Sequence, residues 1–271
     1  MKIGIDARMY GPEQGGIGRY VEQLIQHLQK IDSQNQYIIF LRKINFTACE
    51  IDNPNFKKVL ADIPWYSLKE QLCFTKIIKK EKIDLMHFPH WNVPLFYRGK
   101  FILTIHDLIM YHFPRLEAST HGPIKYWLKD HLHRLVLSSA AHRAKAIIAT
   151  SQFTKQDIVE ELEIKPEKIT VAYQAPFPHK KILTDISQNL QKPYALYVGA
   201  SYPHKNIIGL LRAWKKIEER NDQVNLVLAG RKNYFTQSIL NSSELQNCKH
   251  VQHIPDPTDN DLETLYQNAE L

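Results

Sequence analysis

The sequence predicts an α/β protein built from two doubly wound units, each a parallel sheet with helices on both faces. Short apolar runs alternate with amphipathic helical stretches, and glycine or basic residues directly follow several of these runs. A stretch with several prolines and little periodicity separates two such blocks. We therefore expect a first domain over residues 1–178, a linker over 179–192 and a second, incomplete domain over 193–271.

Length and composition suit such a fold. The chain has 271 residues, and the 44% that are hydrophobic suffice to build a core. Its three cysteines are far apart and form no C-x-x-C pair, which indicates free thiols in a reducing compartment. The first residues lack the apolar segment of a signal peptide, and no run reaches the roughly 18 apolar residues of a spanning helix. We therefore expect a cytoplasmic protein.

The chain is basic, with a formal net charge of +7. Such a charge attracts nucleic acid, an anionic membrane or a phosphorylated substrate. No RNA-binding or helix-turn-helix signature accompanies it, so we expect no nucleic-acid partner. The basic helical stretch Pro123–Ala144 is interpreted as a solvated helix face. Peripheral contact with the inner face of an anionic membrane stays open as an alternative.

The first block opens with a strand, Lys2–Asp6, and a glycine-rich loop over Tyr10–Gly18. Apolar residues then recur at helical spacing as far as Ile31. Glycines between a strand and a helix permit positive φ and let a ligand approach the backbone. Gly15 and Gly16 therefore indicate a phosphate-binding turn. A glycine turn needed only for helix–strand packing is the competing interpretation.

This turn is not the G-x-G-x-x-G of dinucleotide-binding folds. The next strand, Tyr37–Leu41, ends in Arg42 and Lys43 instead of the acidic residue that would hold an NAD ribose. An NADP-type oxidoreductase therefore remains only as a weaker alternative.

Two later strands carry histidines at their carboxyl ends. A helical stretch, Ser67–Glu81, precedes the strand Ile83–Phe88, and a loop with two prolines and His90 follows it. The apolar strand Phe101–Ile105 leads directly into His106 and Asp107. The carboxyl ends of parallel strands line the ligand crevice, so these side chains are candidates for a site. A structural histidine in a local hydrogen-bond network is the competing interpretation.

The first block closes with two more strands. We expect a strand over Lys145–Thr150, and Ser151 after it has the chemistry of an N-cap for the helix that follows. Pro166–Val171 supplies the last strand.

The second block begins with a strand over Tyr194–Val198, a loop from Gly199 to Asn206 and a helix from Ile207. The unpaired amides at a helix start bind anions, and Lys205 adds a full charge there. A lone lysine at a helix start is otherwise a solvated residue. The remaining elements are a strand Val224–Ala229 followed by Gly230 and Arg231, a strand His250–Ile254 and a helix Asp259–Asn268.

We expect no metal site. The histidine pairs His87 and His90, His131 and His133, and His250 and His253 lack a third ligand at motif spacing. Asp259 and Asp261 resemble the D-x-D of metal-dependent transferases, but they begin a helix, where capping accounts for them.

Four segments resemble family 4 retaining glycosyltransferases: Gly15–Tyr20, Ile105–Leu108, Ser151–Ile158 and Gly199–Asn206. The resemblance extends over nearly the whole chain. It implies the GT-B architecture, in which two Rossmann-like domains face a cleft. It also implies transfer of a hexose, with mannose the first candidate, from a nucleoside diphosphate sugar to a saccharide or lipid-linked acceptor in cell-surface polysaccharide synthesis.

The resemblance also assigns residue roles. It implies that Lys205, helped by Arg231 and by amides near Gly15, stabilises the leaving diphosphate without a metal. The implied roles are catalytic for His106 and Asp107, donor-binding for Gly15, Gly16, Ser151, Gly199, Lys205, Asn206 and Arg231, and acceptor-side for Arg19, Tyr20 and His90.

One departure from the family pattern concerns the end of the chain. Members continue past a segment like Tyr266–Leu271 into a strand and a loop with two glutamates, which this sequence lacks. We therefore expect a truncated transferase with little turnover. A non-catalytic nucleotide-sugar-binding fragment remains the main alternative.

Overall fold

The computed structural model describes residues 1–113, 123–176, 184–186, 190–220 and 224–271. The chain divides into two compact units, Met1–Ala175 and Pro176–Leu271, here called unit 1 and unit 2. The predicted linker, residues 179–192, lies largely outside the described residues. No helix among the described residues is long and apolar enough to cross a membrane.

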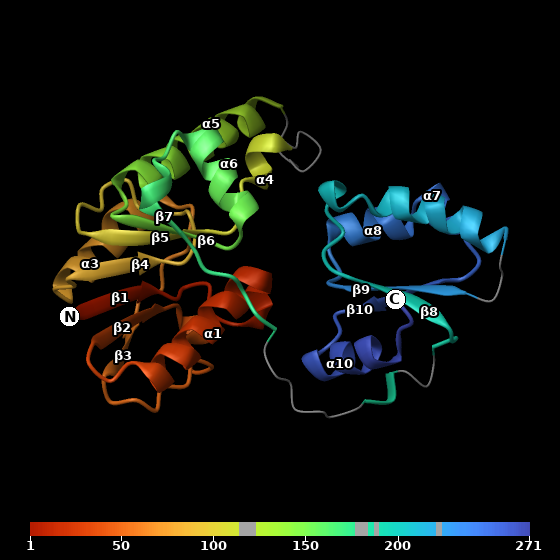
Figure 1. Cartoon of the computed structure of the whole chain (residues 1–271), viewed down its shortest axis with the longest axis horizontal. Helices are drawn as coiled ribbons and strands as arrows, with labels where there is room; N and C mark the ends of the chain where they lie inside the picture. Colours follow the sequence, from red (N-terminus) through yellow and green to blue (C-terminus); the bar gives the residue numbers. More distant parts are fainter. Residues whose placement is uncertain (114–122, 177–183, 187–189, 221–223) are drawn as a thin grey trace. The chain divides into compact units, whose positions relative to one another are not determined.

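Unit 1 contains a seven-stranded sheet in the order β3-β2-β1-β4-β5-β6-β7 (Figure 1). All its strand pairs are parallel. The strands are β1 (Lys2–Asp6), β2 (Gln36–Leu41), β3 (Phe56–Leu60), β4 (Leu85–Phe88), β5 (Phe101–Ile105), β6 (Ala146–Ala149) and β7 (Ile169–Val171).

Helices cover both faces of this sheet. Ile39 and Leu41 of β2 belong to one buried cluster with Val21 and Ile25 of helix α1, whereas the alternate residue Phe40 belongs to a second cluster with helix residues from α3, α5 and α6. Because successive side chains of a strand point to opposite faces, the two clusters lie on opposite sides of the sheet. The helices are α1 (Gly15–Ile31), α2 (Lys43–Phe46), α3 (Thr75–Lys80), α4 (Ile109–His112), α5 (Pro123–Arg143) and α6 (Gln152–Leu162).

Unit 2 repeats this layering on a smaller scale. Its parallel sheet has the order β10-β9-β8, formed by β8 (Tyr194–Val198), β9 (Asn225–Gly230) and β10 (Val251–Pro255). Leu226 and Leu228 pack on helix α7 (Ile207–Glu218), and the alternate residues Val227 and Ala229 share a cluster with Leu265 of helix α10 (Asp259–Asn268). Figure 1 shows α7 and α10 on opposite sides of this sheet. The remaining helices are α8 (Tyr234–Leu240) and α9 (Ser243–Gln246).

Most predicted elements are confirmed, and the differences are local. Gly15–Gly18 forms the first turn of α1 and not a loop, so the helix starts earlier than predicted. Pro166–Lys168 forms a 3₁₀ turn, and the last strand of unit 1 covers only Ile169–Val171. Strand β3 and helices α2, α4, α8 and α9 were not predicted. The predicted helix over Ser67–Glu81 contains a π-helical segment, Glu70–Phe74, before α3.

Candidate functional site

His106 stands directly after β5 at the carboxyl edge of the unit 1 sheet. Its ring Nε2 lies 2.9 Å from the Pro89 carbonyl oxygen, and its Nδ1 lies 3.3 Å from Nε2 of Gln174. A carbonyl can only accept, so Nε2 carries the proton, and Nδ1 accepts from the Gln174 amide. Burial lowers the pKa of His106. The ring is therefore held as one neutral tautomer.

The backbone of His106 is fixed by Thr150 and by the first turn of helix α6. Its carbonyl oxygen accepts hydrogen bonds from the hydroxyls of Thr150 at 2.9 Å and Thr154 at 3.1 Å. Both lone pairs of this oxygen are thus engaged within the protein. The carbonyl oxygen of His106 therefore has no free lone pair for a ligand.

Tyr20 of α1 packs its ring edge-on against His106, with ring centroids 4.8 Å apart. The Tyr20 hydroxyl lies 3.3 Å from Oγ1 of Thr104, which also contacts Nε2 of His87 at 2.8 Å. Burial lowers the pKa of His87 from 6.5 to about 4, and the neighbouring His106 acts in the same direction. These three side chains, Tyr20, Thr104 and His87, therefore support the His106 ring without adding positive charge near neutral pH.

His90 follows β4 and faces two adjoining hollows. The histidine pocket is lined by His90, Trp91, His106, Asp107, Tyr111 and His133, with other apolar residues. The arginine pocket is lined by His90 together with Asp6, Arg8, Trp65 and Asn92. Nδ1 of His90 is buried and has no hydrogen-bond partner among the described residues. Burial lowers the pKa of this histidine from 6.5 to about 3, so the orphaned nitrogen belongs to a neutral ring.

A buried ionic network forms one wall of the arginine pocket. Arg8 is 2% exposed and pairs with Asp6 at 2.7 Å and with Glu70 at 2.6 Å. The Glu70 carboxylate also accepts from the Asn92 amide at 2.8 Å. The network joins Asp6 at the end of β1 to Glu70 of the π-helical segment, and Glu70 in turn to Asn92. Because Asn92 and His90 lie in the same loop after β4, the network fixes that loop.

Asp107 and Ser151 have local structural tasks. Oδ1 of Asp107 accepts from the Ile109 amide at 3.1 Å, which starts α4. The Ser151 hydroxyl accepts from the Thr154 amide at 3.0 Å, which confirms it as the N-cap of α6. Asp107 also lines the histidine pocket.

The glycines at the start of α1 differ in what surrounds them. A Cβ on Gly18 would lie 2.0 Å from the Gly11 carbonyl oxygen, so packing within the chain demands a glycine there. A Cβ on Gly16 would meet nothing within 4 Å, and its backbone has no unusual φ. Gly15 adopts φ +68°, which favours glycine. Neither packing nor backbone conformation therefore requires Gly16 to be a glycine. Arg19, in the same turn, is half-buried.

In unit 2, the loop after β8 leads into α7 through a 3₁₀ turn, Pro203–Lys205. Asn206 is the N-cap, and its side-chain oxygen accepts from the Gly209 amide at 3.2 Å. The first helical bond is donated by Leu210 to the Asn206 carbonyl, so the earlier amides of the helix point into the loop. Lys205 is exposed, and no described residue pairs with its ammonium group.

Thr236 joins this loop to the one after β9. Its hydroxyl lies 2.7 Å from the Arg231 carbonyl oxygen and 3.2 Å from the Ser201 hydroxyl. At the base of the two loops, a Cβ on Gly230 would lie 2.1 Å from the Gly199 carbonyl oxygen. The loops that carry Lys205 and Arg231 are therefore held together at one edge of the sheet.

The structure gathers several predicted residues and adds others. Tyr20, His90, His106 and Asp107 lie around the histidine pocket in unit 1, and Gly199, Lys205, Asn206 and Arg231 lie at one edge of unit 2. Sequence reasoning missed Gln174, His133 and the network around Arg8. An arginine two residues after a strand-end aspartate was the one available signal for the last of these.

Comparison with known proteins supports a common origin with sugar transferases. Residues 14–175 match the model of "Glycosyltransferase Family 4", and residues 179–271 match that of "Glycosyl transferases group 1". The O-antigen chain mannosyltransferase RfbU of Salmonella typhimurium is 26% identical over 236 residues, which are 85% of this chain and 61% of that protein. The chain thus spans less than two thirds of this relative's length.

Solved structures show the same fold. A glycosyltransferase from Rickettsia africae aligns with a TM-score of 0.50 at 17% identity, over 99% of this chain and 70% of that one. The S. aureus MnaA-UDP structure aligns with a TM-score of 0.57 at 12% identity, over 99% of this chain and 72% of that one. These likenesses show an α/β fold of the GT-B class with Rossmann-like units. With a family model matching more than half of its residues, the chain belongs to glycosyltransferase family 4.

Proposed function

We propose that the chain forms the sugar-transferring part of a retaining glycosyltransferase. It takes a hexose, with mannose the first candidate, from a nucleoside diphosphate sugar and passes it to a saccharide or lipid-linked acceptor in polysaccharide synthesis. The name of the 26% identical relative, an O-antigen chain mannosyltransferase, supports both the sugar and the process.

The observation that carries this proposal is Lys205. Cleavage of a sugar–diphosphate bond builds negative charge on the departing phosphate, and fixed donors aimed at that charge lower the barrier. Lys205 offers an ammonium group that no described residue pairs with, beside the open amides of α7, and Thr236 ties the Arg231 loop alongside. This arrangement supplies positive charge from the chain itself, so the reaction is proposed to need no metal ion.

Unit 1 supplies neutral hydrogen-bonding groups. His106 and His90 both line the histidine pocket, Nδ1 of His90 has no hydrogen-bond partner among the described residues, and both rings are uncharged near neutral pH. Sugar hydroxyls are neutral donors and acceptors, so these groups suit a hexose better than a phosphate. The open space beside Gly16 gives a bound ligand access to the amides at the start of α1.

A thermal-shift panel of nucleoside diphosphate sugars, with NADPH included, tests the proposal. A ligand at 100 times its dissociation constant should stabilise the chain by about 2.7 kcal/mol. Stabilisation by NADPH alone would favour an oxidoreductase instead. For ligands that bind, proton NMR of the product formed with a saccharide acceptor should show the anomeric configuration of the donor. An inverted product would contradict retention.

A nucleotide-sugar-binding fragment without turnover is the second candidate, because the chain spans only 61% of the length of RfbU. Binding in the panel without any product would favour this candidate. Measurable transfer would exclude it.

A further inference from the structure

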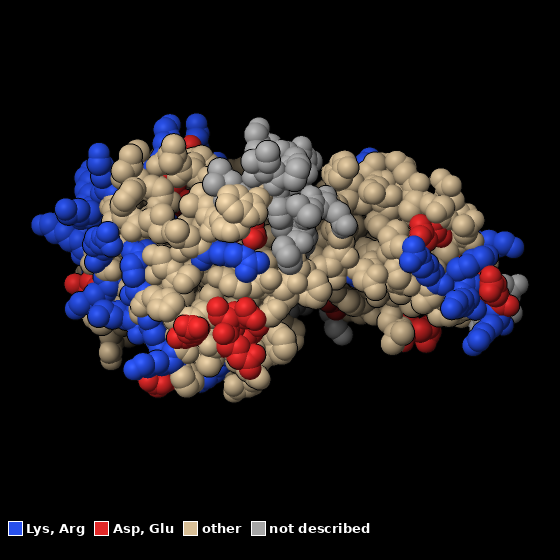
Figure 2. Space-filling view, turned by 90° about the horizontal axis from the view of Figure 1, so that it is seen from above, with Lys and Arg blue, Asp and Glu red and all other residues tan. Residues whose placement is uncertain are grey.

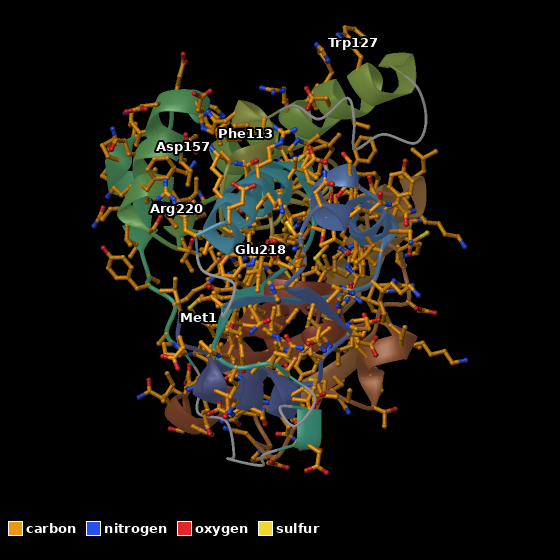
Figure 3. The ribbon with its side chains drawn as sticks, turned by 90° about the vertical axis from the view of Figure 1, so that its right-hand side faces the viewer. Met1, Phe113, Trp127, Asp157, Glu218 and Arg220 are labelled. Carbon is orange, nitrogen blue, oxygen red and sulfur yellow. The ribbon has the colours of Figure 1, made fainter. Side chains whose placement is uncertain are left out.

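The end of α4 meets the middle of α6 at a cluster of three ligand-type side chains, here called the His112 cluster: His112, Asp157 and Glu161. Nε2 of His112 lies 2.6 Å from Oδ1 of Asp157. One donor atom from each of the three residues lies within 4.8 Å of the others. Figure 3 labels Asp157 and Phe113, the residue after His112, which lie in the same part of unit 1.

The sequence pattern did not reveal this cluster. His112 and Asp157 are 45 residues apart in the chain, so the usual ligand spacings are absent. Asp157 and Glu161 are one helical turn apart on α6 and therefore share one face of the helix. The fold alone brings the imidazole onto that face.

The donors determine which ion would suit the cluster. One imidazole nitrogen and two carboxylates carry a charge of about −2 once the ring is neutral, which favours a divalent cation. Imidazole suits zinc, nickel and cobalt, whereas magnesium and calcium prefer oxygen donors alone. Three protein ligands leave one position of a tetrahedral zinc ion for water.

The surrounding charges are compatible with a cation. Arg134 is a positive group that contacts α4, since its guanidinium lies over the Tyr111 ring and bonds the Met110 and Tyr111 carbonyls. That charge is compensated by Asp130 at 2.8 Å. Figure 2 shows a compact group of acidic side chains on the face of unit 1 that α6 reaches in Figure 1.

The geometry points to the His112 cluster as a binding site for one divalent ion of the zinc class. Binding requires Nε2 of His112 to release the proton that it donates to Asp157, and the ion takes that proton's place between the two residues. The site is separate from the proposed transfer chemistry, because none of its three residues lines the histidine pocket or the arginine pocket.

A bound ion would act as a clamp. Helix α4 carries Met110 and Tyr111, which line the histidine pocket, and the start of α6 bonds the His106 carbonyl through Thr154. Joining α4 to α6 would therefore stiffen the elements on either side of His106. The competing interpretation is a simple ion pair between His112 and Asp157, with no affinity for metal.

Metal binding can be measured without any enzymatic readout. The whole chain, freed of metal with a chelator and dialysed, should bind one equivalent of ZnCl₂ in calorimetry, and CoCl₂ should give the visible absorption of a low-symmetry site. Glu161→Gln and His112→Gln should each raise the zinc dissociation constant at least about tenfold, since even outer-shell changes have effects of that size. Asp157 is buried, so its replacement is avoided.

Two matched variants separate the site from general surface binding. Glu160→Gln changes the neighbouring exposed carboxylate on α6, and His131→Gln removes an exposed histidine from α5. Both should leave zinc affinity within about twofold, a difference of roughly 0.4 kcal/mol. The inference fails if the native chain binds no zinc in the micromolar range. It also fails if Glu161→Gln and His112→Gln, still folded by circular dichroism, bind zinc as the native chain does.

Discussion

The two strand-end sites of this molecule differ in charge and in exposure. In unit 1, the His106 ring is half-buried, neutral and held through both nitrogens. In unit 2, Lys205 is exposed, and no described residue pairs with it. The same strand-loop-helix geometry thus supports two kinds of recognition. One suits the neutral hydroxyls of a sugar, and the other suits the charged oxygens of a diphosphate.

The largest expected effect is on the free energy of unfolding. It distinguishes Gly18, which packing requires, from Gly16, which is proposed to leave room for a ligand. Gly18→Ala should lower the free energy of unfolding by at least about 3 kcal/mol, because the new Cβ would overlap the Gly11 carbonyl. Gly16→Ala, where a Cβ meets open space, should change it by no more than about 1 kcal/mol. Urea denaturation of both variants tests this. Equal losses would show that Gly16 is also a packing residue.

The charged site is tested by Lys205→Ala. Loss of the ammonium group should weaken binding of a nucleoside diphosphate by about 1.5 to 3 kcal/mol, the range for hydrogen bonds to charged groups. Calorimetry measures this difference. Lys216→Ala, an exposed lysine in the last turn of α7, serves as the control and should leave affinity unchanged. An unaltered affinity of the Lys205 variant would show that this lysine is only a solvated residue.

The neutral site should give the protein an acid-sensitive stability. The pKa of His87 is about 4 in the folded chain against 6.5 for an ordinary histidine, so the unfolded chain binds protons more readily. The contribution of His87 to stability is then constant above about pH 7 and falls as the pH drops from about 6.5 towards 4, by roughly 2 kcal/mol at pH 5. His90 acts in the same direction.

Unfolding free energies measured between pH 7 and pH 5 test this slope. His87→Gln should reduce the slope and leave the part that His90 contributes, whereas replacement of the exposed His131 by Gln should not change it. A slope that His87→Gln leaves unchanged would assign the acid sensitivity to other groups.

The smallest effect concerns the tautomer of His106. Gln174→Ala removes the donor to Nδ1, a hydrogen bond of about 0.5 to 1.5 kcal/mol, and should let the second ring tautomer become populated. Nitrogen-15 NMR of the histidine rings reports this directly. Gln156→Ala, which removes an exposed bond to Glu160, is the matched control. A single unchanged tautomer in the Gln174 variant would show that the Pro89 carbonyl is sufficient.

The fold could be predicted where local signals agreed. Helix α10 has the predicted bounds, because Thr258 and Asp261 form a capping box at its start. Strand β3 was missed because two lysines interrupt its apolar pattern. The structure shows that Lys58 folds back onto the Phe46 ring and bonds the Phe46 and Cys49 carbonyls, contacts that no local pattern contains.

In the candidate site, too, only the residues that a local pattern marks could be predicted. His106 followed from its place after an apolar strand, which is a local property. Gln174 reaches His106 across 68 residues, and Glu70 reaches Arg8 across 62. Such partners depend on the order of strands in the sheet, and periodicity does not encode that order. The His112 cluster is invisible in the sequence for the same reason.

The contrast in charge also affects how fast an anion would be captured. Neutral rings such as His90 and His106 exert no attraction at long range, whereas the field of Lys205 extends over a Debye length of about 10 Å at 0.1 M ionic strength. The attraction that Lys205 exerts on an anionic ligand is therefore expected to weaken as counter-ions screen it. Contacts made at the histidine pocket take effect only after arrival, so they influence how long a ligand stays and are insensitive to ionic strength.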